Sequence, residues 1–225
     1  MTRLLRAFTL AVALLALLAI VACGDDEGEG PSAPSVGEGE TTPTAQVTPA
    51  PTIPAAAPAI EMGIDPETTG NTASTLGTLE SCVRVDVPSP AFDGVSDHNI
   101  DVYVKGDTQS PVGYEVSVTY DQNIVHIAAP GTDTLIKMPG ALEPSPETLP
   151  DSDGMFIAGA LHLDPAKFGT PGDGALVRLG LDIGGSGVVT FSLDPPADNG
   201  YATDAGIHDA THVSAQLAIN QDCPQ

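Results

Sequence analysis

Two short segments of this 225-residue chain carry residue types that perform catalysis or bind zinc in other proteins. The segment GGSGV at residues 184–188 nearly matches the Gly-x-Ser-x-Gly turn that exposes a nucleophilic serine, but it ends in Val188 and joins two predicted strands. It therefore indicates a hairpin turn. His208 and His212 are four residues apart and would share a face only on a helix, whereas their surroundings predict a loop entering a strand. The sequence predicts no catalytic residues and no metal site here.

Acidic turns supply the oxygen ligands that calcium prefers. The segment DSDG at residues 151–154 looks like the middle of a calcium loop, but alignment on its glycine puts Leu149 and Ala160 at the first and last ligand positions. Neither side chain can coordinate, and DNG at residues 198–200 fails in the same way. Because Asp and Asn are common turn residues, we expect turns at both places. No cofactor is expected, although a Ca²⁺ site assembled from separate loops stays open.

Aromatic side chains are scarce, which bears on sugar binding because sugar rings stack on tryptophan and tyrosine. The chain has no tryptophan and four tyrosines. Tyr114 and Tyr120 alternate with polar residues and are expected in the core, whereas Tyr103 and Tyr201 are expected at more exposed sites. Two scattered tyrosines make a poor platform. No pair of carboxylates stands apart as a glycosidase would require, so an enzyme is not expected.

The elements that must position these residues are short stretches in which apolar and polar residues alternate, separated by Gly, Pro, Asp and Asn. In the most regular one, residues 113–120 alternate, residues 121–123 turn the chain, and residues 124–127 form the second strand of a hairpin. Further strands are expected at residues 83–87, 100–104, 155–163, 175–183, 188–193 and 213–219. No segment has a sustained helical period. The pattern predicts an all-β domain, an antiparallel β-sandwich or jelly roll of about nine strands.

The N-terminus has the features of a secretory signal: Arg3 and Arg6 precede an apolar run, which ends at IVAC, residues 20–23. The run is too short for a membrane-spanning helix, which needs about 20 apolar residues. Its last four residues resemble the lipobox of bacterial lipoproteins, in which the cysteine is lipidated and becomes the new N-terminus. The resemblance implies removal of residues 1–22 and attachment through Cys23 to the cell membrane, facing the extracellular or periplasmic side.

Residues 23–80 are interpreted as the lipidated cysteine and a disordered tether rich in Pro, Thr, Gly and Glu, and residues 81–225 as the folded domain. Residues 1–22 hold two of the seven basic residues and none of the thirty acidic ones, so the mature chain would carry a net charge of −25. Such a chain lacks the basic surface that nucleic acids require. It would also be repelled by anionic lipid, which leaves the lipid anchor as its membrane contact.

Cys82 and Cys223 flank the predicted domain and lie in a compartment where disulfides persist. A Cys82–Cys223 bridge is therefore favoured over two free thiols.

The predicted strands resemble the cohesin domain, a nine-stranded jelly roll of cellulosome scaffolds related to some carbohydrate-binding modules. YDQNIVHI at residues 120–127 is similar to the family's Tyr-Asp-Pro-Asn-Val-Leu-x-Val, with Gln122 in the proline's place. GDGALVRL at residues 172–179 is similar to its Asp-Gly-Val-Leu-Ala-x-Ile. The resemblance covers about residues 80–221. It also implies parallel first and last strands, so either Cys223 folds back after Asn220 or the bridge is absent.

The resemblance implies a non-enzymatic module that binds another extracellular protein, such as one with a dockerin module. It also implies that the polar side of the strand with Glu115, Ser117 and Thr119 is the contact surface. These three are equally expected as ordinary solvated strand positions. Direct binding of polysaccharide, through polar contacts or calcium, is the alternative function.

Overall fold

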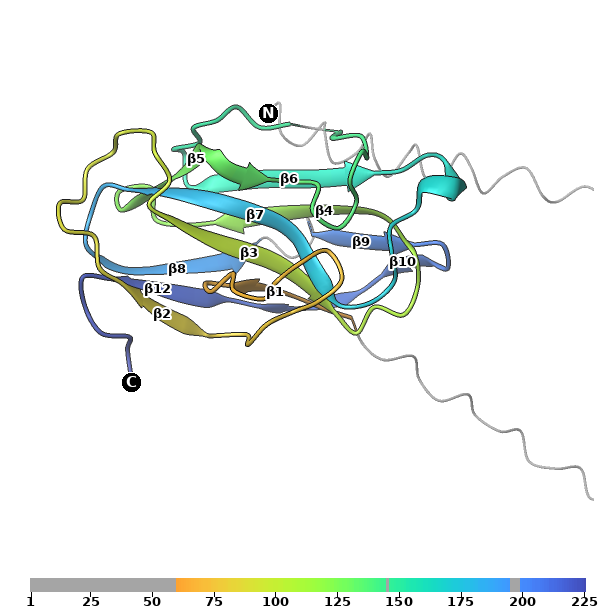
Figure 1. The fold of residues 1–225 in the computed structure, drawn as a ribbon, viewed down its shortest axis with the longest axis horizontal. Coiled ribbons are helices and arrows are strands. Elements are labelled where there is room, and N and C mark those ends of the chain that lie inside the picture. The colour runs from red at the N-terminus through yellow and green to blue at the C-terminus, as the bar shows by residue number, and fades with distance from the viewer. Residues whose placement is uncertain (1–59, 145, 195–198) are drawn as a thin grey trace, which may run out of the picture. The chain divides into compact units, whose positions relative to one another are not determined.

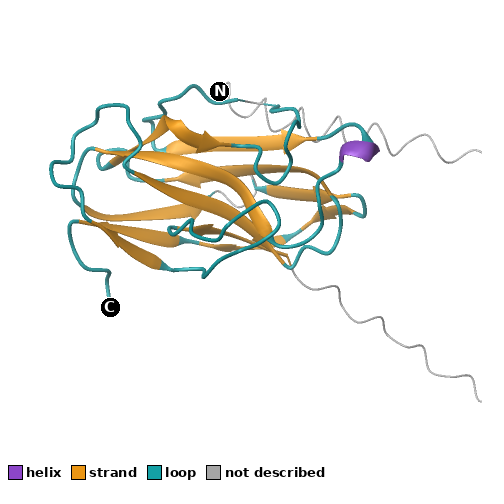
Figure 2. Ribbon diagram, in the orientation of Figure 1, coloured by secondary structure: helices purple, strands orange, loops and turns teal. Residues whose placement is uncertain are grey.

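The structure, a computed structural model, describes residues 60–144, 146–194 and 199–225. Cys23 and residues 24–59 of the expected tether lie outside these ranges. Figure 2 shows that the described part consists of strands and loops with one 3-10 helix, η1 (Pro165–Lys167), and none of its helices is long and apolar enough to cross a membrane. The strands are β1 (Ile60–Asp65), β2 (Cys82–Val85), β3 (His98–Lys105), β4 (Pro111–Thr119), β5 (Val125–Asp133), β6 (Met155–Leu161), β7 (Gly174–Ile183), β8 (Gly187–Leu193), β9 (Gly200–Thr203), β10 (Gly206–His208), β11 (Ala210–Val213) and β12 (Ala215–Ile219).

The strands form two sheets, which confirms the predicted all-β sandwich (Figure 1). The five-stranded sheet has the order β11-β1-β3-β7-β5. The seven-stranded sheet has the order β10-β9-β4-β8-β12-β2, with β6 paired along the other edge of β4. Pairing is antiparallel except for the parallel pairs β1–β11 and β2–β12. Alternate side chains of the central strands, such as Val116 and Val118 of β4, are fully buried in one hydrophobic core.

The folded domain begins earlier than the sequence indicated. β1 lies between β3 and β11, although its residues were assigned to the tether. Packing requires a glycine at position 63 of β1, because a Cβ there would lie 2.5 Å from the Tyr103 side chain. The expected boundary at residue 81 is therefore wrong, and the described residues from Ile60 onward belong to the sandwich.

Two connections that were expected to be hairpin turns instead cross from one sheet to the other. Asp121 does start a turn, since its carbonyl accepts hydrogen bonds from the amides of Ile124 and Val125. However, β4 before the turn and β5 after it belong to different sheets. The same holds for residues 184–186, which join β7 of the five-stranded sheet to β8 of the seven-stranded sheet. Both hairpin predictions are wrong, because turn residues are equally suited to a sheet crossing.

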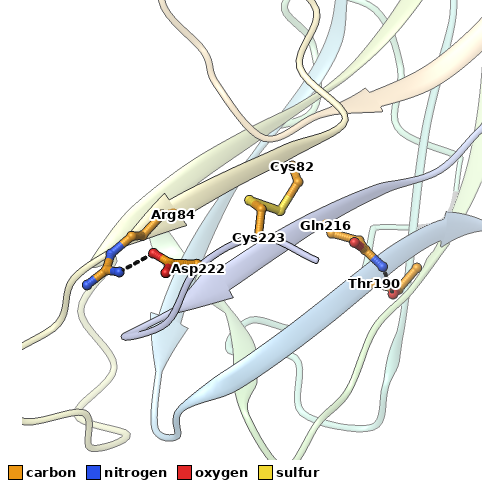
Figure 3. The surroundings of a disulfide bond; sticks show 6 residues. All are labelled: Cys82, Arg84, Thr190, Gln216, Asp222 and Cys223. Carbon is orange, nitrogen blue, oxygen red and sulfur yellow. Dashed lines mark hydrogen bonds and ion pairs between the residues drawn. A yellow bond between two sulfur atoms is a disulfide. The ribbon is translucent and has the colours of Figure 1, made fainter. Parts of the chain in front are cut away.

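Cys82 and Cys223 form a disulfide with a Cα separation of 6.0 Å, as favoured from the sequence (Figure 3). β2 and β12 are parallel, so Cys223 must come back toward the start of β2. Asn220 makes this possible: its φ is 58°, and its side chain bonds both the amide and the carbonyl of Val87. Arg84 then pairs with Asp222 at 2.6 Å beside the bridge. The chain folds back after Asn220, the first of the two outcomes expected.

The outer face of the five-stranded sheet is covered by the loops at residues 66–80 and 88–97. Asp101 of β3 is fully buried there and forms a two-pronged ion pair with Arg178 of β7, at 2.7 and 2.8 Å. Burial raises the pKa of the Asp101 carboxyl, and Arg178 opposes the rise. Asp182 of β7 accepts the amides of Asp93 and Gly94 from the second loop. β3 and β7 are thus buried on both faces, not on one as their alternation indicated.

Candidate functional site

Glu115, Ser117 and Thr119 all point from β4 to the outer face of the seven-stranded sheet, opposite the buried Val116 and Val118. Glu115 and Thr119 are partly exposed, but Ser117 is only 1% exposed. The Ser117 amide donates to Asn199 Oδ1 at 2.8 Å. Ser117 thus lies on the outer face as expected, but it is buried there and not solvated. A role of the three residues in partner binding stays a prediction.

Glu115 lies between two glycines. Its cross-strand neighbours are Gly159 of β6 and Gly200 of β9, so no side chain stands directly beside it on either strand. A Cβ at Gly200 would meet no atom of the described residues within 4 Å, and one at Gly159 would lie 3.2 Å from the Tyr114 carbonyl oxygen and 3.8 Å from Pro144. Glu115 itself is partly exposed on this face.

The next line of residues across the sheet is apolar. It crosses five adjacent segments, each paired with the next. We call it the apolar row, and it consists of Ile207 (β10), Ala202 (β9), Gly113 (β4), Leu161 (β6) and Leu142. At its two ends Ile207 is 68% exposed and Leu142 is 58% exposed. Gly113 is required at its centre, because a Cβ there would come within 2.9 Å of the Ala160 carbonyl.

Sequence reasoning missed the apolar row, since β9 and β10 are too short to show a period and were not predicted. Ile207 and Leu142 are single apolar residues among polar and turn residues. An isolated apolar residue in a polar segment is the only signal that pointed to either, and it is a weak one.

All four tyrosines are buried, and each hydroxyl donates a hydrogen bond. Tyr103 bonds the Glu61 carboxylate and Tyr201 bonds that of Asp107, so the expected exposure of these two tyrosines is wrong. Tyr114 and Tyr120 lie in the core as predicted, where their hydroxyls bond main-chain carbonyls and, for Tyr120, the Asp151 carboxylate. Burial raises the pKa of all four phenols. No tyrosine presents its ring to a ligand.

The histidine pair does not converge. His208 lies in β10 with its Nε2 2.7 Å from the Thr203 hydroxyl, whereas His212 lies in β11 of the other sheet. Asp151 accepts the Tyr120 hydroxyl and Asp153 accepts the Met155 amide, as residues of a turn do. In the part of the chain that the structure describes, no group of three or more His, Cys, Asp or Glu side chains is placed to hold a metal ion.

No family model matches the chain, and no curated protein matches it. Several solved structures are similar. A non-cellulosomal cohesin from the hyperthermophilic archaeon Archaeoglobus fulgidus is 11% identical, covers 72% of this chain and 92% of its own, and has a TM-score of 0.47. The OlpA cohesin of Clostridium thermocellum, solved in complex with a dockerin, is 11% identical, covers 72% and 99%, and has a TM-score of 0.48. The cohesin module of a Clostridium perfringens family 33 glycoside hydrolase is 15% identical, covers 73% and 99%, and has a TM-score of 0.46. These similarities concern the fold, and no ligand is transferred from them.

Proposed function

We propose that this chain is a non-enzymatic, lipid-anchored extracellular protein whose β-sandwich binds another extracellular protein, with a dockerin-like module as the first candidate partner. The observation that carries the proposal is the distribution of apolar side chains. The outer face of β4, β6 and β9, which carries Glu115, also carries aliphatic residues, among them Leu142 of the adjoining segment and Ile207 of the neighbouring strand, while every tyrosine is buried. Aliphatic patches are typical of protein interfaces, whereas sugar rings stack on exposed aromatic rings.

The lipid anchor rests on the lipobox-like residues 20–23 and on the acidic tether that follows Cys23. The domain carries too few basic residues to hold an anionic surface, so attachment needs the acyl chains. Replacing Cys23 with Ser should move the protein from the membrane fraction to the soluble fraction. A C23S chain that sediments with membranes as before would contradict the anchor.

The binding function is tested with the full-length chain held in lipid nanodiscs. Purified dockerin modules and a panel of cell-wall and plant polysaccharides are passed over it, each with and without Ca²⁺. We expect retention of a dockerin module and of no polysaccharide. Retention of a polysaccharide that strengthens with Ca²⁺, without any protein ligand, would replace protein binding by the alternative function.

A further inference from the structure

The apolar row gathers exposed apolar side chains that are otherwise sparse. Six large apolar side chains are well exposed in the described residues: Phe92, Val95, Leu142, Leu163, Ile207 and Val213. Leu142 and Ile207 end the row, and Leu163 lies two residues beyond its member Leu161. At about 4.8 Å between neighbouring strands, the five segments span about 19 Å. Gly113 is buried and Ala202 and Leu161 are partly exposed, so the row is well exposed at its two ends. An apolar strip of this kind marks an interaction surface.

Carboxylates lie close in sequence to the members of the apolar row. Glu143 follows Leu142 directly, and Asp204 and Asp209 flank Ile207. Asp164 lies three residues beyond Leu161, and Glu115 lies two residues beyond Gly113 on the same face. No Lys or Arg occurs within three sequence positions of any member of the row. The strip therefore lies in a negative field, which selects partners by charge.

Charge decides between the possible occupants of this surface. A twofold dimer pairs one patch with the same patch of the second copy. The carboxylates near the row of one copy would therefore face those of the other copy and repel them. The chain as a whole carries a formal charge of −23, so phosphate-rich polymers and anionic lipids are repelled too. A partner protein with basic residues is attracted instead.

We infer that the apolar row binds a protein segment whose apolar side chains are flanked by Lys or Arg. This inference rests on the proposed protein-binding function and specifies the chemistry of its partner. It moves the centre of the site from Ser117, which is buried, to the row beside it.

The test places the photo-crosslinking residue p-benzoylphenylalanine in the full-length chain, in cells that make this protein. One position is Ala202, next to the centre of the row, and the control position is Thr190 of β8, an exposed residue on the outer face of the same sheet. Crosslinked peptides are sequenced by mass spectrometry. We expect Ala202 to capture a segment of another protein that contains apolar and basic residues, and Thr190 not to capture it.

Substitutions on the row then separate its apolar from its electrostatic contribution. The pair I207S and L142S should lower the yield of the Ala202 crosslink roughly tenfold, because it removes the two most exposed apolar side chains of the row. The pair E143K and D204K should lower the yield of the Ala202 crosslink at least about threefold. The control E80K makes the same change of charge at one site in the loop before β2 and should leave this yield unchanged. In isolated membranes, raising NaCl from about 50 to about 500 mM should also weaken the crosslink by at least about threefold.

Several outcomes would overturn the inference. Capture at Ala202 of a second copy, or of a segment without basic residues, would show that the occupant has another chemistry. Capture of a protein at Thr190 but not at Ala202 would leave the binding function standing and remove the apolar row as its site. If neither position captures a protein while the chain held in nanodiscs retains a polysaccharide, both the proposed protein-binding function and this inference are wrong.

Discussion

The two sheets of the sandwich share one core but treat their outer faces in opposite ways. The five-stranded sheet is covered by two loops and buries charged residues beneath them, including Asp101 of the Asp101–Arg178 ion pair. The outer face of β4, β6 and β9 in the seven-stranded sheet is partly exposed, although Ser117 is buried on it, and it carries Glu115 and the apolar row. Buried polar groups with well-defined partners stabilise a single structure, whereas exposed apolar residues add little to stability and are free to bind. The difference indicates that one face serves the fold and the other serves recognition.

Loss of the Cys82–Cys223 bridge should have the largest effect on stability. The bridge spans 141 residues and fastens β2, the edge of the open-faced sheet farthest from the apolar row. Closing a loop of that length stabilises a protein by up to about 5 kcal/mol in the chain-entropy model. Urea unfolding should show this loss in the double variant C82S/C223S and equally in reduced wild type. A reductant that leaves the wild-type midpoint unchanged would contradict it, and the double variant, which should ignore the reductant, is the control.

Breaking the ion pair on the covered face should have the next largest effect. Asp101 is fully buried, whereas the Arg178 side chain is 31% exposed and can turn toward water. R178M strands a buried carboxylate and should cost about 3 kcal/mol of unfolding free energy, with D101A costing less. The double variant D101L/R178M should recover most of the loss.

A matched change on the open face checks this assignment. T190A removes an exposed hydroxyl on β8 that accepts a bond from Gln216 and should change the unfolding free energy by less than about 0.5 kcal/mol. Equal losses from R178M and T190A would mean that the two faces do not differ in the way proposed.

Much of the sandwich was predictable because β4 and β7 alternate cleanly between apolar and small or polar residues. The sheet to which each strand belongs was not, since period two identifies a strand but not its neighbour. β1 was missed because Gly63 and two acids interrupt its apolar residues, and its fit depends on Tyr103, forty residues away. Asp101 reads as a solvated strand position from sequence alone. Its burial depends on loops whose own polar composition gives no sign that they cover a sheet.

The candidate site was predictable only in part, for the same reason. Alternation along β4 correctly placed Glu115, Ser117 and Thr119 on the outer face, but it could not show that Ser117 is buried there, where Asn199 Oδ1 accepts a hydrogen bond from its amide. The apolar row combines residues from five segments, so no single stretch of sequence carries its pattern. Only the pairing of β10, β9, β4 and β6 brings Ile207 and Leu161 onto one line.

Acidification should distinguish the buried from the exposed carboxylates. Burial raises the pKa of Asp101 and of Asp151, so each binds a proton at higher pH in the folded than in the unfolded chain. Stability should therefore rise as the pH falls from neutral through these raised values, until the unfolded carboxyls also titrate near about 3.9. Glu67 acts in the opposite direction, because hydrogen bonds from Thr69 lower its pKa, but it is solvent-screened and its effect is small.

The variant D151N tests the origin of this rise. Its Oδ1 still accepts the Tyr120 hydroxyl, so the fold keeps that contact while the titrating group is removed. Urea midpoints measured between pH 7 and 4 should rise less steeply for D151N than for wild type. The control T190A, which removes no titrating group, should keep the wild-type slope. A D151N slope equal to wild type would remove Asp151 as a source of the rise and leave it to Asp101 or to relief of charge repulsion.

The smallest effect on stability should come from the residues that matter most for binding. Ile207 and Leu142 are already largely exposed, so replacing each with Ser removes little buried area from the folded state. The unfolding free energy should change by less than about 0.5 kcal/mol for each, and slightly in either direction. Far-UV circular dichroism and urea unfolding of I207S and L142S measure this directly. A loss of 2 kcal/mol or more would mean that the row is packed as part of the fold. Unchanged stability combined with lost crosslinking would show that Ile207 and Leu142 serve binding and not the fold.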